Sequence, residues 1–312
     1  LDFTIRTTPR AEALLKALSR RRVRICFVVY DLLPVLRPEW WPEGAGVRHE
    51  MWLRSLTAVA DTVCCISKSV AQEFSEWLNE AGFSATQDQP AVQWFHLGGD
   101  IARSAPSSGM PAGYRQTTDA MANGQSFLMV GTLEPRKGHA QVLAGFELLW
   151  ERDLSLNLVI VGKRGWMLEE FVARLESHRE LGKRLFWLDA VSDECLEDLY
   201  RRSTCVLAAS EGEGFGLPLV EAAQREKPII ARSLPVFREV AGEGAFYFDG
   251  LLPEDVSESV LAWSALHSEG RAPSSAAIQS LTWDDSARQL LDALAVDHQI
   301  HDDCQIFEER VG

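Results

Sequence analysis

The sequence lacks a long apolar run and an excess of positive charge. No stretch reaches the roughly 18–20 consecutive apolar residues that a membrane-spanning helix needs, so no such helix is predicted. The 31 Lys and Arg residues are outnumbered by 45 Asp and Glu residues, and the formal net charge is −14. Nucleic-acid binding depends on clustered cations that neutralise phosphates, so we expect no nucleic-acid partner. A local cationic pocket for one phosphorylated ligand remains compatible with this charge.

The cysteine patterns of metal and redox sites are also missing. None of the six cysteines belongs to a C-x-x-C pair or to a Cys/His spacing typical of a metal site. Four of them lie in apolar, strand-like runs. We therefore expect buried, reduced thiols, as in a cytoplasmic protein, and no metal ion.

The chain does have enough length and apolar content for two domains. It contains 312 residues, of which 46% are apolar, and ten tryptophans. Because it begins at Leu1 without an initiator methionine, we expect it to be a fragment of a longer protein.

The N-terminal region predicts part of an α/β domain. Residues 1–22 form a basic amphipathic segment with three leucines on one helical face. Two interpretations stay open: a peripheral contact with an anionic membrane surface, or a helix that covers a sheet. Residues 23–30 follow as a buried strand. Asp31 comes at its carboxyl end, where open α/β sheets bind ligands.

The composition changes at residues 98–124, which are rich in Ser, Pro and Gly and show no sustained period. This pattern predicts a linker between domains. We therefore place a first domain at 1–105, a linker at 106–124, a second domain at 125–282, and a C-terminal helix with a polar tail at 283–312.

After the linker, strand and helix patterns alternate, which predicts a doubly wound parallel sheet. The predicted strands are 126–131, 156–162, 185–188, 204–208 and 228–231. The predicted helices are 138–150, 166–178, 193–202, 217–225 and 236–241, followed by 253–267 and 284–295.

Residues 210–223 combine a glycine-rich turn with two glutamates, Glu213 and Glu221, eight positions apart. Glycines let the backbone turn sharply and approach a ligand closely, and Pro218 suits the first position of a helix. We expect both carboxylates and a row of backbone N–H groups to face one crevice. Such a crevice would bind a polar ligand with hydroxyl groups and an anion.

A second motif, residues 130–138, joins a predicted strand to a helix and places Arg136 and Lys137 at the helix start. Two cations there oppose the helix dipole, so a bound diphosphate is a good reason for their presence. The alternative is a solvated loop with basic residues by chance. Neither the Walker A order nor the spacing of the dinucleotide fingerprint is present.

Together these motifs resemble the retaining GT-B glycosyltransferases of family 4. The resemblance is carried by Val-Gly-Thr-Leu-Glu-Pro-Arg-Lys-Gly at 130–138, Leu-Val-Ile-Val-Gly at 158–162, and Glu-Gly-Phe-Gly-Leu-Pro at 213–218 with Glu221. It covers residues 126–250 closely and 20–100 more loosely. In particular, the sequence is similar to mannosyl- and rhamnosyltransferases of bacterial O-antigen and exopolysaccharide assembly. The resemblance implies an α/β GT-B fold, in which two Rossmann-like domains with doubly wound parallel sheets face a cleft. The N-terminal domain would be incomplete.

The resemblance also implies residue roles. Arg136 and Lys137 would neutralise the diphosphate of a nucleotide-sugar donor. Glu213 would contact the donor sugar, and Glu221 would hold the ribose hydroxyls. Asp31, Glu213, Arg136 and Lys137 are thus the catalytic candidates. The remaining donor-binding candidates, placed through their backbone groups, are Gly131, Thr132, Val191, Gly214, Phe215, Gly216 and Leu217.

One departure from the family concerns Tyr30 and Asp31, because many members carry His-Asp at these positions. That histidine usually reaches the donor sugar, so we assign the candidate role to Asp31 and none to Tyr30. For Asp31, a capping or turn role is the alternative.

The implied function is retaining transfer of a hexose, mannose or a deoxy-mannose, to a growing glycan or lipid-linked glycan. The donor would be a nucleotide-sugar, with a GDP-sugar favoured, and no metal or other cofactor would be needed. The alternatives are a GT-B epimerase or phosphorylase, and an inactive nucleotide- or glycan-binding module. We expect the protein in the cytoplasm or at the cytoplasmic face of the inner membrane. Its oligomeric state stays open.

Overall fold

The chain folds into two compact units. The structure, a computed structural model, describes residues 8–83, 89–100 and 106–308. Unit 1 comprises residues 1–98 and 281–312, and unit 2 comprises residues 99–280. The divisions therefore fall after residues 98 and 280, whereas we predicted them at 105 and 282; residues 101–105 lie outside the described part.

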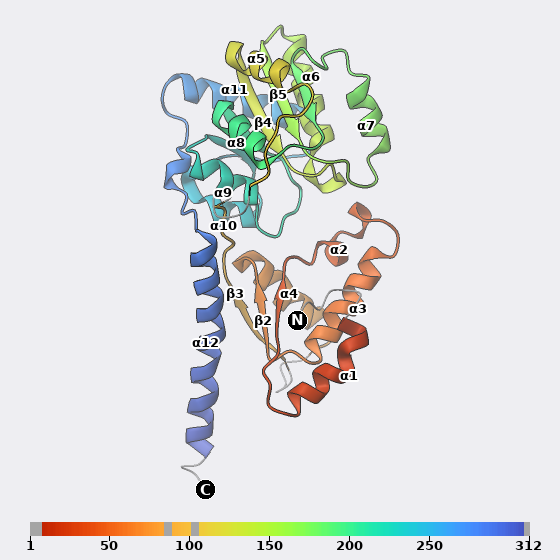
Figure 1. Cartoon of the computed structure of the whole chain (residues 1–312), viewed down its shortest axis with the longest axis vertical. Helices are drawn as coiled ribbons and strands as arrows, with labels where there is room; N and C mark the ends of the chain where they lie inside the picture. The colour runs from red at the N-terminus through yellow and green to blue at the C-terminus, as the bar shows by residue number, and fades with distance from the viewer. Residues whose placement is uncertain (1–7, 84–88, 101–105, 309–312) are drawn as a thin grey trace. The chain divides into compact units, whose positions relative to one another are not determined.

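Unit 1 is built on a small parallel sheet with the strand order β1-β2-β3. Its elements are α1 (Thr8–Ser19), β1 (Cys26–Val29), α2 (Leu33–Leu36), η1 (Pro38–Trp40), α3 (Ala45–Thr57), β2 (Thr62–Cys65), α4 (Lys68–Glu80), β3 (Ala91–Trp94) and α12 (Trp283–Glu308) (Figure 1). Ser67 caps α4, because its hydroxyl accepts a hydrogen bond from the Val70 N–H at 3.1 Å.

The basic helix α1 packs against α3 within unit 1. Leu15 is buried, and Leu18 packs on the same apolar cluster. Leu14 does not share this face, because 53% of its surface is exposed. These contacts agree with the interpretation of α1 as a covering helix, and contact with a membrane remains a prediction. Across the described residues, none of the helices has the length and apolar character needed to cross a bilayer.

Helix α12 is longer than the sequence predicted and returns the chain to unit 1. It runs without interruption to Glu308, so the polar tail predicted beyond the helix 284–295 is helical as far as residue 308; residues 309–312 lie outside the described part. The physical reason is that no glycine or proline occurs between its ends. Gln289 of α12 accepts a hydrogen bond from the backbone N–H of His96 at 3.0 Å.

Unit 2 contains a parallel sheet with the strand order β6-β5-β4-β7-β8-β9. Its elements are α5 (Tyr114–Asn123), β4 (Gln125–Val130), η3 (Pro135–Lys137), α6 (His139–Glu151), β5 (Leu156–Val161), α7 (Glu169–Glu176), β6 (Leu185–Leu188), α8 (Asp193–Arg202), β7 (Cys205–Ala208), α9 (Leu217–Gln224), β8 (Ile229–Arg232), α10 (Pro235–Ala241), η4 (Gly242–Gly244), β9 (Phe246–Phe248), α11 (Pro253–Ser268) and η5 (Ser275–Ala277) (Figure 1). The chain moves outward in one direction from β4 to β6 and in the other from β7 to β9. The predicted doubly wound parallel sheet is confirmed.

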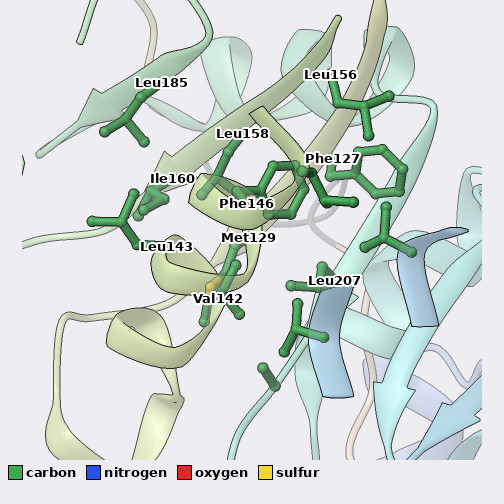
Figure 2. Packing of buried hydrophobic residues seen from close by; sticks show 14 of the residues in the cluster. Phe127, Met129, Val142, Leu143, Phe146, Leu156, Leu158, Ile160, Leu185 and Leu207 are labelled. Carbon is green, nitrogen blue, oxygen red and sulfur yellow. The ribbon is translucent and has the colours of Figure 1, made fainter. Parts of the chain in front are cut away.

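The core of unit 2 follows from the two-residue period of its strands. Phe127 and Met129 of β4 share one face with Leu158 and Ile160 of β5, and α6 packs on this face (Figure 2). Phe127 also meets the ring of Trp263 from α11 edge-on, with centroids 5.6 Å apart. Full burial of one such apolar side chain stabilises the fold by about 1.5–3 kcal/mol. Helices α5, α8 and α9 contact strands β5, β4 and β7 respectively.

Two elements of unit 2 correct the sequence prediction. The linker predicted at 106–124 is in fact helical over α5, which packs on the domain. The Tyr114 hydroxyl donates to Asp198 Oδ2 at 2.6 Å, and Asn157 Nδ2 donates to the Ala120 carbonyl at 2.9 Å. Strand β9 was not predicted at all, because it has only three residues.

Candidate functional site

The candidate site of unit 2 lies at the carboxyl ends of β4 and β7, two neighbouring strands. From β4 the chain continues toward one side edge of the sheet, and from β7 it continues toward the other, so these two strands form the switch point of the sheet. Such a switch point is where open α/β sheets form their ligand crevice. Residues 131–138 follow β4 and residues 209–216 follow β7. The two motifs singled out in the sequence therefore meet at one place.

Backbone contacts join the two loops. The Glu211 N–H donates to the Arg136 carbonyl at 2.7 Å. Gly138 has φ +74°, and a Cβ at this position would lie 2.3 Å from the Ala209 carbonyl oxygen. Only glycine fits both the conformation and the space, and it lets the turn Pro135–Lys137 lie directly against the end of β7.

Glu213 receives both cations of the β4 loop. Arg136 Nη1 lies 2.8 Å from Glu213 Oε2, and Lys137 Nζ lies 2.5 Å from Oε1. The Ser210 hydroxyl also donates to Oε1, at 2.7 Å. The side chains of Arg136, Lys137 and Glu213 are only 13%, 14% and 10% exposed. Arg136, Lys137 and Glu213, three of the predicted catalytic residues, thus form one nearly buried ion cluster.

A second carboxylate completes this cluster. Glu134 Oε2 lies 2.9 Å from Arg136 Nε. Burial raises the pKa of Glu134, although the charges of Arg136 and Lys137 oppose this. Burial acts in the same direction on Glu213, but the charges of Lys137 and Arg136 and the hydrogen bonds of Lys137 and Ser210 outweigh it and hold the pKa of Glu213 below its ordinary value. Glu213 is therefore an anion at neutral pH, paired with two cations that a phosphate could also use.

Glu221 stands apart from the ion cluster. It is the fifth residue of α9, and its Oε2 accepts a hydrogen bond from the Tyr200 hydroxyl at 2.6 Å. Burial raises its pKa, which the Tyr200 hydrogen bond and the charge of Arg225 partly offset. The two glutamates therefore have different partners and cannot act as one acid–base pair through a direct contact.

The glycine-rich turn brings the backbone to the start of α9. Gly216 is the N-cap residue with φ +102°, and a Cβ there would lie 2.7 Å from the Phe237 ring. Pro218 lies in the first turn, as predicted. Because glycine has no side chain to cap the helix, the first N–H groups of α9 are suited to an anion. Contacts of Gly214, Phe215 and Leu217 with a donor remain predictions.

The other donor-binding candidates lie on loops at the same edge of the sheet. Gly131 follows β4 with φ +152°, and its carbonyl oxygen would lie 1.8 Å from a Cβ on Gly162. Thr132 comes next in this loop. Val191 is half-buried in the loop after β6, just before the Ser192 N-cap of α8. Their roles toward a donor stay predictions.

Asp31 belongs to unit 1, so its candidate role is separate from this cluster. Its Oδ1 accepts a hydrogen bond from the Leu33 N–H at 3.1 Å at the start of α2, and its carbonyl oxygen lies 3.1 Å from His49 Nε2. The turn role considered for Asp31 is thus observed, because its side chain accepts from the backbone two residues further on, whereas Leu32 is the N-cap of α2 and a role of Asp31 in catalysis stays a prediction. Tyr30 is 61% exposed.

Several residues of the site were missed or misjudged in the sequence. His139, the first residue of α6, is only 2% exposed, and its burial, followed by the charge of Lys137, lowers its pKa to about 3. Arg232 was not noticed, although its Nε donates to the Ser210 carbonyl at 3.0 Å and its Nη2 to the Ala209 carbonyl at 3.1 Å. The available signal was an arginine directly after an apolar strand run. Tyr200 carried no sequence signal that we recognised.

The described residues contain no group of three or more His, Cys, Asp or Glu side chains suited to a metal ion. Five cysteines within the described part are free thiols. The prediction that the chemistry needs no metal stays a prediction.

Comparison with known proteins identifies one family model and several relatives. Residues 114–277 match the family described as Glycosyl transferases group 1. The serotype-specific mannosyltransferase WbdA of Escherichia coli is 44% identical over 296 residues, which is 95% of this chain and 36% of WbdA. The O-antigen chain mannosyltransferase B of Escherichia coli is 34% identical over 41% of this chain and 33% of its own length. The chain thus spans little more than a third of the curated relatives that it matches.

Solved structures share the fold at low sequence identity. HepE of Anabaena, crystallised with UDP and glucose, has a TM-score of 0.65 and 16% identity, covering 97% of this chain and 76% of HepE. Sucrose-phosphate synthase of Thermosynechococcus elongatus has a TM-score of 0.61 and 16% identity, covering 98% and 79%. The family match covers more than half of the chain, and this chain therefore belongs to the glycosyl transferases group 1 family.

Proposed function

We propose that this chain binds a nucleotide-sugar in unit 2 and transfers its hexose, mannose or a deoxy-mannose, to a growing glycan or lipid-linked glycan. The observation that carries the proposal is the cluster of Arg136, Lys137 and Glu213 at the switch point of the sheet. The names of the relatives support mannose as the sugar.

The cations would serve the leaving group. Breaking the bond between sugar and diphosphate places negative charge on the diphosphate, and stabilising that charge is the main electrostatic demand of the reaction. A nearly buried Arg and Lys meet this demand better than exposed ones, because water screens them less. The acceptor hydroxyl would attack from the face on which the diphosphate leaves, so the configuration of the sugar is retained. The departing phosphate would take the acceptor proton, so no separate base is needed. On this proposal no metal is needed.

Glu213 would change partners when the donor binds. A diphosphate competes for the same cations, so the carboxylate becomes available for hydroxyls of the donor sugar. The amides from Gly214 to Leu217, in the turn before α9 and at its first residue, would lie against the sugar and phosphates together with Gly131 and Thr132. Glu221 would hold the ribose, and the backbone at Val191 would face the base.

The remaining features of the proposal concern donor, acceptor and location. A GDP-sugar is the favoured donor, and Asp31 of unit 1 would act on the acceptor side. We place the protein in the cytoplasm or at the cytoplasmic face of the inner membrane, where the basic helix α1 could make a peripheral contact with anionic lipid.

Two substitutions should separate binding from turnover. Lys137→Met removes a cation and should weaken binding of a nucleoside diphosphate by about 10–100-fold. Glu213→Gln removes the competing carboxylate, so binding should be as tight as in the wild type or tighter, while transfer falls by at least roughly 100-fold. Calorimetric titration with GDP and UDP measures binding, and product analysis with GDP-mannose and UDP-glucose measures transfer.

The exposed Lys183 offers a matched control, and Lys183→Met should change neither quantity. The transferase proposal fails if the wild type binds none of these nucleotides at millimolar concentration. Binding of a donor without transfer to any glycan would instead favour the inactive binding module.

A further inference from the structure

Helix α8 carries a buried tyrosine beside the Glu221 carboxylate. Tyr200 is 0% exposed, and its hydroxyl donates to Glu221 Oε2 at 2.6 Å. The bond joins α8 to α9 across 21 positions of sequence. A buried phenol hydroxyl needs a hydrogen-bond partner, and an ionised carboxylate is a stronger acceptor than a neutral group.

Arg225 contacts the ring of the same tyrosine. Its guanidinium carbon lies 4.9 Å from the centre of the Tyr200 ring. Its Nη1 donates to the Glu221 carbonyl at 2.6 Å, and its Nε donates to Glu197 Oε2 at 2.8 Å. The burial of Tyr200 and the cation above its ring therefore both restrict its side chain. Neither the sequence motifs nor the proposed transfer chemistry uses these contacts.

The Tyr200 bond restricts how Glu221 can turn. A glutamate side chain has three rotatable bonds, and a hydrogen bond to one oxygen selects one arrangement of them. In the part of the chain that the structure describes, no side chain donates to the other oxygen, Oε1. A carboxylate that is already oriented loses less conformational freedom when it binds a ligand, so it binds more tightly and more selectively.

We propose that Tyr200 is a positioning residue that orients the Glu221 carboxylate for the ribose hydroxyls of the donor nucleotide and so confers selectivity for ribose over deoxyribose. This inference rests on the proposed function, because it takes Glu221 as the ribose contact. Tyr200 acts through Glu221 and is not itself a catalytic residue.

The charges around Glu221 agree with this role. Burial raises the pKa of Glu221, and Asp193 and Glu197 of α8 add to the rise. The Tyr200 hydrogen bond and the positive charge of Arg225 oppose it. Removal of the Tyr200 hydroxyl takes away a contact that lowers the pKa of Glu221. The carboxylate should therefore take up its proton at a higher pH than in the wild type.

The test compares ribonucleotides with their 2′-deoxy analogues. Dissociation constants are measured for GDP, 2′-deoxy-GDP, UDP and 2′-deoxy-UDP with the wild type and with Tyr200→Phe, which keeps the ring and removes only the hydroxyl. We expect the wild type to bind each ribonucleotide more tightly than its 2′-deoxy analogue. In Tyr200→Phe, the ratio of the two dissociation constants should fall about tenfold. When the solution is acidified, nucleotide binding by Tyr200→Phe should also begin to weaken at a higher pH than binding by the wild type.

Tyr114→Phe is a closely matched control. The Tyr114 hydroxyl also donates to a carboxylate of α8, Asp198 Oδ2, at the same distance of 2.6 Å. Tyr114→Phe removes the same kind of bond in the same unit, but away from Glu221. It should therefore keep the ribose preference of the wild type, and a loss there would point to a general effect on α8 and overturn the assignment.

If Tyr200→Phe does not fold, Glu221→Gln still tests whether the Glu221 carboxylate determines the preference for ribose. We expect Glu221→Gln to lose the ribose preference as well, and the double variant to lose no more than either single one. An unchanged preference in Tyr200→Phe or in Glu221→Gln would overturn the inference while leaving nucleotide binding intact. Failure of the wild type to bind any of the four nucleotides would instead refute the proposed function.

Discussion

At the scale of single residues, Glu73 is a half-buried acid that the proposed chemistry does not use. It lies on α4 of unit 1, and its Oε2 has no hydrogen-bond partner within the described residues. Burial, followed by the charges of Asp31 and Glu76, raises its pKa to about 7. The folded protein therefore holds the Glu73 proton more tightly than the unfolded chain does.

This proton predicts a pH-dependent stability. Because the folded pKa is raised, the stability contribution of Glu73 is present below about pH 4.5 and is lost as pH rises through about 7. Glu73→Gln mimics the protonated form, so it should raise the free energy of unfolding at pH 8 by on the order of 2 kcal/mol and change it little at pH 4.5. Thermal unfolding followed at both values measures this. Glu80→Gln, on the exposed end of the same helix, is the control. Equal effects of Glu73→Gln at both pH values would contradict the prediction.

At the scale of elements, the turn between β4 and α6 depends on one glycine. Gly138→Ala would place a methyl group 2.3 Å from the Ala209 carbonyl at φ +74°. We expect a loss of about 2–4 kcal/mol in stability and weaker nucleoside diphosphate binding, because the loop that carries Arg136 and Lys137 must shift.

Gly270→Ala is a control that separates the cost of a positive φ from the cost of a steric clash. Gly270 has φ +67° in the same unit, but no atom lies within 4 Å of its added Cβ. This control should lower stability by only about 1 kcal/mol and leave nucleotide binding unchanged. Denaturant unfolding and calorimetric titration of both variants are the measurements, and equal losses at the two positions would show that the contact with β7 does not matter.

The same elements show how far the sequence carries the fold. The strand and helix alternation from residue 125 onward is readable because its strands are apolar and its helices have apolar faces. Helix α5 cannot be recognised in this way. The residues that it buries include Thr117 and Thr118, so its buried face shows no periodic pattern of apolar residues. The polar end of α12 misled in the opposite way: its composition is typical of a solvated tail, yet nothing in it breaks a helix.

The candidate site needed more than local pattern. Arg136 and Glu213 are 77 positions apart, and only the strand order that makes β4 and β7 neighbours brings them together. The family resemblance supplied the residues, but not the direct pairing of both cations with Glu213. Tyr200 and Arg232 could not be found from spacing, because each acts through a contact between different elements.

At the scale of the whole molecule, the two units have separate apolar cores. Because the proposed donor site lies in unit 2, a bound nucleoside diphosphate should slow amide hydrogen exchange there, above all after β4 and β7 and in the first turn of α9. At 100 times its Kd, a ligand stabilises the state that binds it by about 2.7 kcal/mol. Strands β1, β2 and β3 should exchange as before. Hydrogen-exchange mass spectrometry with GDP or UDP, and with the nucleoside alone as control, checks this; protection confined to unit 1 would contradict it.

The return of the chain to unit 1 bears on how the protein is made. Helix α12 contacts β2 and β3, so the sheet of unit 1 lacks part of its covering until residues 281–308 have been synthesised. These residues leave the ribosome after the whole of unit 2. Unit 2 can thus complete its core first. The sheet of unit 1 is completed only when α12, encoded more than 180 codons downstream of β3, has been synthesised. Ribosome stalling or premature termination after residue 280 would release a finished unit 2 attached to an unfinished unit 1.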